Sequence, residues 1–148
     1  MSSPRGLLLH VWIASELSGA LLETNLRLEG VDTDFYGTLS LIGAFGPLTP
    51  SDLAERAGAP ATTVSDRVRR MVEEGDVERV AHPEDGRSHL LRLTKEGDKR
   101  WRRGWPALRK TIAQISKNLE RPVDEVDDAL QDLIEATRTA SRKLNTIP

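Results

Sequence analysis

The chain has 148 residues, of which 38% are hydrophobic and 4% aromatic, and its formal net charge is −2 at pH 7. This length allows one domain with a hydrophobic core, built mostly from aliphatic side chains. The net charge excludes a histone-like protein that coats DNA through bulk positive charge. Because the chain contains no cysteine, disulfides, thiolate zinc sites and cysteine-based redox sensing are excluded as well.

The first predicted helix covers residues 6–28, where apolar side chains recur at helical spacing, and Gly30 ends it. It is apolar around more of its circumference than a surface helix requires. Such a helix needs a second partner surface, which we expect a second copy of the chain to supply; the alternative is a helix wrapped by its own domain. No apolar run approaches the roughly 20 residues that span a bilayer, and the N-terminus lacks a secretory pattern, so a cytoplasmic protein without membrane contact is expected.

A second helix is predicted between a cap at Asp32 or Thr33 and a break at Gly46-Pro47. We expect it to support the next two helices from behind, with an inner face formed by Phe35, Leu39 and Ile42.

Two short helices follow, and the first of them has a clear start. Thr49 is a candidate N-cap, Pro50 suits the first helical position, and Asp52 stands where a capping box needs an acceptor. Gly58 can supply a left-handed end. The second short helix is predicted from about Ala59 and Pro60 to Gly75, with a buried face at i, i+4, i+7 and i+8 formed by Val64, Val68, Met71 and Val72.

The other face of this second short helix has small polar residues at its front and arginines behind. That arrangement suits a helix that enters a major groove closely. The candidate DNA contacts on it are Thr62, Thr63, Ser65, Arg67, Arg69 and Arg70.

Two strands are predicted next, at residues 77–81 and 88–93, around the turn sequence HPEDGR. A hairpin directly after a recognition helix is typical of the wing of a winged helix-turn-helix. Arg87 at its tip could reach phosphates or the narrow minor groove.

The same stretch resembles the multiple-antibiotic-resistance-regulator (MarR) family of repressors. The most specific part is the Asp-x-Arg wing tip followed by Leu-x-Leu-Thr-x-x-Gly. The resemblance implies a homodimeric transcription factor in which Arg87 contacts the minor groove and Asp85 helps to orient it. Family members often carry a basic residue after the position of Ser65, whereas this chain has Asp66; that departure puts base contacts at 66 in doubt and favours Arg69 or Arg67 instead. The matching segments are Leu53-Ala54, Val64-Ser65, residues 75–79, residues 83–87 and residues 91–97.

After the wing, Thr94 is a good N-cap for a helix that continues to about Leu119. Gly104 and Pro106 interrupt its pattern, which predicts a kink near Gly104. The last helix is predicted at residues 123–144. The resemblance implies that the first and last helices of both subunits interlock.

A pocket for a flat aromatic effector is a further hypothesis, because family members often bind small phenolic ligands where the dimer helices meet the DNA-binding part. Tryptophan at helical spacing is also commonly core, so both interpretations stay open. The candidate pocket residues are His10, Trp12, Trp101 and Trp105.

The sequence therefore predicts a mainly α fold with a small β-hairpin wing, in one domain of residues 1–148. Residues 31–97 form the winged helix-turn-helix, and residues 6–29 and 98–148 supply dimerisation helices. We expect a homodimeric transcription regulator that acts as a repressor, binds double-stranded DNA at a pseudo-palindromic operator and is released by a small aromatic effector. No enzyme motif, metal site or cofactor site is predicted. The alternative is a winged helix used only for protein contact.

Overall fold

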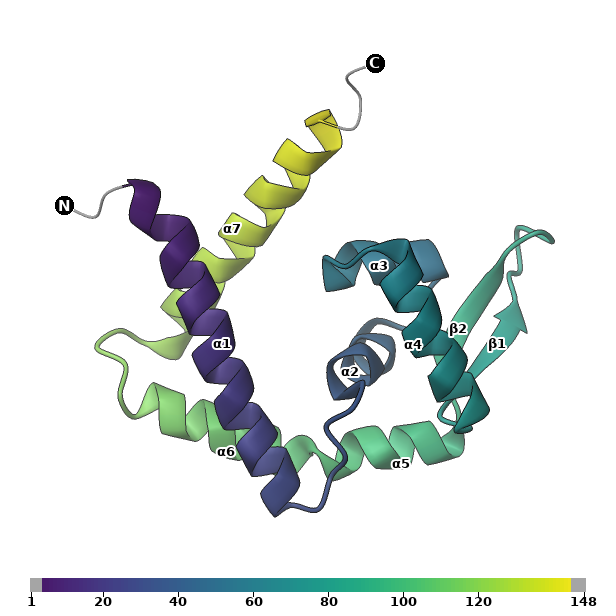
Figure 1. Ribbon diagram of the computed structural model, residues 1–148, viewed down its shortest axis with the longest axis horizontal. Coiled ribbons are helices and arrows are strands. Elements are labelled where there is room, and N and C mark those ends of the chain that lie inside the picture. Colours follow the sequence, from purple (N-terminus) through teal and green to yellow (C-terminus); the bar gives the residue numbers. More distant parts are fainter. Residues whose placement is uncertain (1–3, 145–148) are drawn as a thin grey trace. The chain divides into compact units, whose positions relative to one another are not determined.

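The computed structural model describes residues 4–144 and confirms a mainly α fold with one antiparallel hairpin (Figure 1). The chain divides into two compact units, residues 1–110 and residues 111–148. In chain order the elements are α1 (Pro4–Leu28), α2 (Tyr36–Phe45), α3 (Pro50–Ala57), α4 (Ala61–Glu73), β1 (Val77–Ala81), β2 (His89–Leu93), α5 (Lys95–Arg103), α6 (Trp105–Ser116) and α7 (Val123–Leu144).

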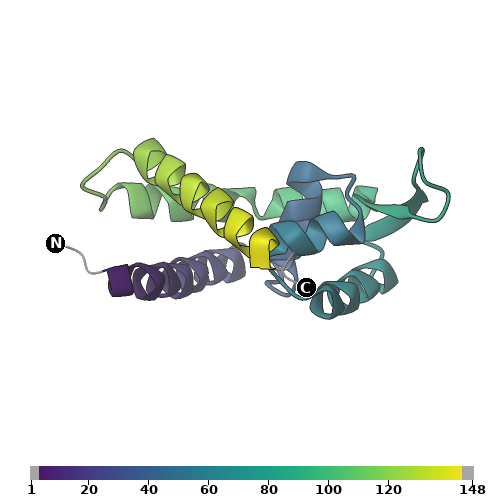
Figure 2. The same cartoon turned by 90° about the horizontal axis from the view of Figure 1, so that it is seen from above.

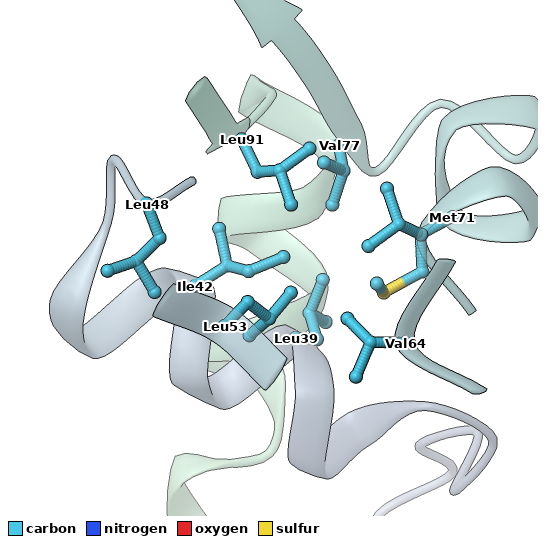
Figure 3. Close-up of a cluster of buried hydrophobic side chains, with 9 residues drawn as sticks. Leu39, Ile42, Leu48, Leu53, Val64, Met71, Val77 and Leu91 are labelled. Atoms are coloured by element: carbon cyan, nitrogen blue, oxygen red, sulfur yellow. The ribbon is translucent and has the colours of Figure 1, made fainter. Parts of the chain in front are cut away.

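The core of the winged helix lies between α2, α3, α4 and the base of the hairpin (Figure 3). Leu53 on α3 and Leu91 on β2 are fully buried in it. Leu48 adds a short bridge to β2, since its N–H donates to the Leu91 carbonyl at 3.1 Å and its carbonyl accepts from the Leu91 N–H at 2.7 Å. The wing is thereby tied to the segment before α3. The buried members of the cluster are Leu39, Ile42, Leu48, Leu53, Val64, Val68, Met71, Val77 and Leu91.

The predicted start and end of α3 are confirmed. The Thr49 hydroxyl accepts from the Asp52 N–H at 3.1 Å, while an Asp52 carboxylate oxygen lies 3.4 Å from the Thr49 N–H, which completes the capping box. Gly58 ends the helix with a left-handed φ of 59°. Local side-chain chemistry therefore determines this element.

The predicted cap of α2 is wrong. The helix begins at Tyr36. The residue before it, Phe35, has a φ of 62°, in the left-handed region that residues other than glycine rarely adopt. Asp32 instead accepts the Asp34 N–H at 2.9 Å and closes a local turn. Because Phe35 occupies the cap, its ring is only partly buried against the core.

The hairpin pairs Val77 with Leu93 and Ala81 with His89, and it projects beyond the helices of residues 1–110 (Figure 2). Thr94 caps α5 as predicted, accepting from the Gly97 N–H at 3.0 Å.

At the predicted kink the helix is interrupted at Gly104, the single residue between α5 and α6. Pro106 lacks the N–H that would continue the helix. The Tyr36 hydroxyl donates to the Trp101 carbonyl at 2.8 Å, and the Tyr36 ring occupies the space that a Cβ at Gly104 would need. A second core cluster joins the end of α1 to this place through Leu26, Val31, Tyr36 and Ala107.

The N-terminal part of α1 exposes large apolar side chains. Leu17 is 68% exposed, and the exposed Ile13 and Leu9 lie one and two helical turns before it. Contrary to the sequence-based expectation, the stretch Gly6–Leu28 is long and apolar enough to cross a membrane by length and composition alone. That test is weak evidence, since core helices and signal sequences also pass it.

The second unit contains the end of α6 and α7, whose bounds agree with the predicted range of 123–144. Asp124 and Glu125 lie in the first turn of α7 and Arg142 and Lys143 in the last, which complements the helix dipole. Leu130 and Ile134 on α7 are about half exposed.

Candidate nucleic-acid interface

The exposed face of α4 is polar, and its opposite face is part of the core. Val64, Val68 and Met71 are buried at helical spacing. The small side chains at the front of the helix, Thr62, Thr63 and Ser65, are exposed as predicted. A helix held by one apolar face and free on the other can be inserted into a DNA groove without disturbing the core.

The three arginines of α4 have different surroundings. The Arg69 guanidinium is exposed, and its Nη2 donates to an Asp66 carboxylate oxygen at 3.3 Å. Arg67 is half-buried, with Nη1 3.5 Å from the Thr38 hydroxyl on α2. The Arg70 guanidinium lies 4.6 Å from the centre of the Phe35 ring. Arg67 is thus directed towards α2. Arg70 is exposed but lies over the ring of Phe35, the residue before α2, and Arg69 belongs to the exposed polar face.

The tip of the wing is shaped by Asp85. One of its carboxylate oxygens accepts from the Arg87 N–H at 3.0 Å, and its carbonyl accepts from the Ser88 N–H at 3.1 Å. Asp85 therefore orients Arg87 through the backbone of the turn. The Arg87 side chain is exposed.

Sequence patterns missed the junction between α4 and the wing. Asp76 is buried, and the Arg100 guanidinium on α5 contacts its carboxylate at 2.6 Å and that of Glu74 at 3.1 Å. Burial raises the pKa of the Asp76 carboxyl above its ordinary value, while the Arg100 charge opposes the rise. The Thr94 hydroxyl donates to the Gly75 carbonyl at 2.6 Å. These contacts fasten the turn between α4 and β1 to the start of α5.

A groove of about 500 Å³ lies between α1, the segment before α2, and α4. The side chains around it combine apolar surface with the hydroxyls of Thr33 and Thr38 and the guanidinium of Arg67. None of the four predicted effector residues lines this groove. The groove is also lined by Leu22, Glu23, Leu26, Asp34, Phe35 and Tyr36.

The predicted effector residues lie in different surroundings. His10 and Trp12 are exposed on α1. Trp101 packs against both core clusters and meets Trp105 edge to face, with ring centroids 5.4 Å apart. These contacts support the interpretation of Trp101 as a core residue. An effector pocket built from these four residues remains a prediction.

A helix-turn-helix followed directly by a two-stranded hairpin defines the class of this protein: a winged helix-turn-helix. The particular family follows from a comparison of sequences, in which residues 31–88 match the model of the MarR family. This match confirms the resemblance to the MarR family over these residues. A search of curated protein sequences gives no significant match.

Solved structures of the same fold cover nearly the whole chain. The M. tuberculosis transcriptional regulator MOSR in complex with DNA has a TM-score of 0.72 at 23% identity, covering 90% of this chain and 96% of that one. Apo MarR from E. coli has a TM-score of 0.67 at 24% identity, covering 93% and 98%. CouR from Rhodococcus jostii RHA1, bound to p-coumaroyl-CoA, has a TM-score of 0.72 at 18% identity, covering 92% of each chain. At these identities the likeness establishes the fold.

Proposed function

We propose that this chain is a homodimeric, sequence-specific DNA-binding transcription regulator, acting as a repressor in the cytoplasm, where its DNA lies. The observation that carries the proposal is the exposed polar face of α4, with Arg69, beside a wing that exposes Arg87. The DNA complex of the similar MOSR supports it. Two recognition helices would enter successive major grooves ~34–36 Å apart, with the wings in the flanking minor grooves.

Removing the wing arginine is the direct test. For Arg87→Ala we expect the free energy of DNA binding to weaken by about 1–3 kcal/mol, because each wing loses a charged contact in a groove of strong negative potential. Fluorescence anisotropy with an operator duplex selected from a random library, at two salt concentrations, measures the change. Arg109→Ala on α6 removes the same charge from another exposed position and serves as the matched control.

Unchanged affinity of the Arg87 variant at matched salt would remove the wing from the mechanism. Equal and weak binding of the wild-type protein to every duplex would favour the second candidate function, a winged helix used for protein contact. The acidic side chain of Asp66 on the exposed face of α4 is the feature that favours this alternative.

The groove beside Arg67 is the site we propose for an effector that releases DNA. An aromatic carboxylate would match a cation flanked by hydroxyls and rings, and CouR shows that a protein of this fold holds an aromatic acyl ligand. A ligand bound there would contact Arg67, which lies on the same helix as the proposed DNA-contacting residues. The coupling is reciprocal, so DNA must weaken effector binding by the same factor.

For a saturating aromatic acid, beginning with benzoate as the probe, we expect DNA affinity to fall roughly 5- to 150-fold. Arg67→Ala should abolish this response while the variant still binds DNA, and anisotropy titrations with and without the acid measure both. Trp12→Ala is the comparison variant, because Trp12 belongs to the pocket predicted from the sequence. Loss of the response in Trp12→Ala alone would place the effector at that predicted pocket and not in the groove.

A further inference from the structure

We propose that Asp66 is a positioning residue that holds the Arg69 guanidinium for recognition of a guanine in the major groove. The inference rests on the proposed DNA binding and names the base that α4 selects. Asp66 and Arg69 are one helical turn apart on the exposed face, with the guanidinium Nη2 3.3 Å from the carboxylate.

The surroundings of the arginines single out Arg69. The Arg67 guanidinium is directed to the Thr38 hydroxyl on α2, and the exposed Arg70 guanidinium lies over the ring of Phe35, the residue before α2. The Arg69 guanidinium contacts Asp66 on its own helix, and the Arg69 side chain is 64% exposed. It is therefore the arginine of α4 that can meet a base edge while α4 keeps its core contacts.

The chemistry of the pair suits guanine. A guanidinium has five N–H donors in a planar fork, and guanine offers two acceptors, N7 and O6, in the major groove. One donor given to Asp66 leaves four, enough for a bidentate contact. The carboxylate restricts the rotation of a long side chain, so less conformational entropy is lost when the base is bound.

An acidic residue at this position should also affect selectivity and affinity in opposite directions. A carboxylate near phosphates disfavours DNA of every sequence, since the backbone supplies most non-specific attraction. Its benefit appears only where Arg69 finds its guanine. Removal of the charge should therefore leave non-specific binding equal or tighter while it reduces discrimination between bases.

The test is selection from a random duplex library with the wild-type protein, followed by anisotropy with the selected operator and with duplexes that replace each G·C pair by A·T. Wild type should lose roughly 5- to 150-fold in affinity at one guanine in each half-site. In Asp66→Asn that ratio should fall by up to about fivefold, in line with the strength of an exposed ion pair. Asp66→Glu should keep most of it.

Two controls separate positioning from a structural effect. Glu96→Gln removes the acid of an exposed i, i+3 pair of the same kind, Glu96–Lys99 at 2.7 Å on α5, and should leave the ratio unchanged. In an Arg69→Ala background, Asp66→Asn should have no further effect on the ratio, because the group that it positions is gone.

Unchanged discrimination at every base pair in Asp66→Asn, with wild type selective, would overturn the positioning role and leave the proposed function standing. A further loss in the Arg69→Ala background would overturn it too, since Asp66 would then act on its own. If wild type enriches no sequence, the proposed regulator function fails and the inference fails with it.

Discussion

Gly97→Ala is expected to destabilise the fold by about 3 kcal/mol or more. Gly97 is buried in the first turn of α5, and a Cβ there would lie 2.8 Å from the Asp76 carbonyl carbon and closer still to its oxygen. That oxygen accepts the Thr94 N–H at 2.9 Å and so cannot move without breaking the contact between the α4–β1 turn and α5. Urea denaturation, at one protein concentration, measures the loss in the free energy of unfolding.

Gly37→Ala is the matched control, because Gly37 lies within α2, is exposed, and has nothing within 4 Å of an added Cβ. Alanine at this helical position should stabilise the protein by about 0.5–1 kcal/mol. The two substitutions are chemically identical and should act in opposite directions. A Gly97 variant as stable as wild type would show that the turn between α4 and β1 moves freely against α5.

The parts of the fold that the sequence predicts correctly depend on residues near one another in the chain. The Thr49–Asp52 capping box, the Gly58 helix end and the turn around Asp85 are all closed by partners within a few residues. The buried residues of α4 recur at helical spacing, so the sequence also predicts which residues of α4 lie on its exposed face.

The features that the sequence does not predict depend on distant partners. The left-handed Phe35 breaks the local preference that indicated a cap at Asp32 or Thr33, and the Arg70 guanidinium that stacks on its ring comes from another helix. Asp76 and Arg100 are 24 positions apart, and no periodicity predicts that they meet. The same limit applies to the proposed DNA site. The sequence places three arginines on α4 and already favours Arg69, but the contacts of Arg67 with Thr38 and of Arg70 with the Phe35 ring depend on the tertiary fold.

The exposed apolar surface of α1 is the part of the chain for which the proposed homodimer matters most. Leu9, Ile13, Leu17 and Leu21 follow one another at four-residue spacing, and the first three are exposed. Side chains at this spacing form a ridge that packs into the groove of another helix. A ridge of this kind left in water is unfavourable, and a second subunit would cover it.

Leu17→Glu should therefore disrupt the dimer, because it places a charge in the middle of this ridge, where burial would cost far more than exposure. A dimer binds two half-sites together, so separation of the subunits should weaken operator binding by about 100-fold or more. Light scattering coupled to size-exclusion chromatography measures the mass, and anisotropy measures the affinity. Ser15→Glu adds the same charge to an exposed position on the opposite side of α1 and should change neither quantity. A Leu17→Glu protein that remains a dimer with full operator affinity would show that this ridge is covered by something other than a second subunit, and the apolar circumference of α1 would then need a different explanation.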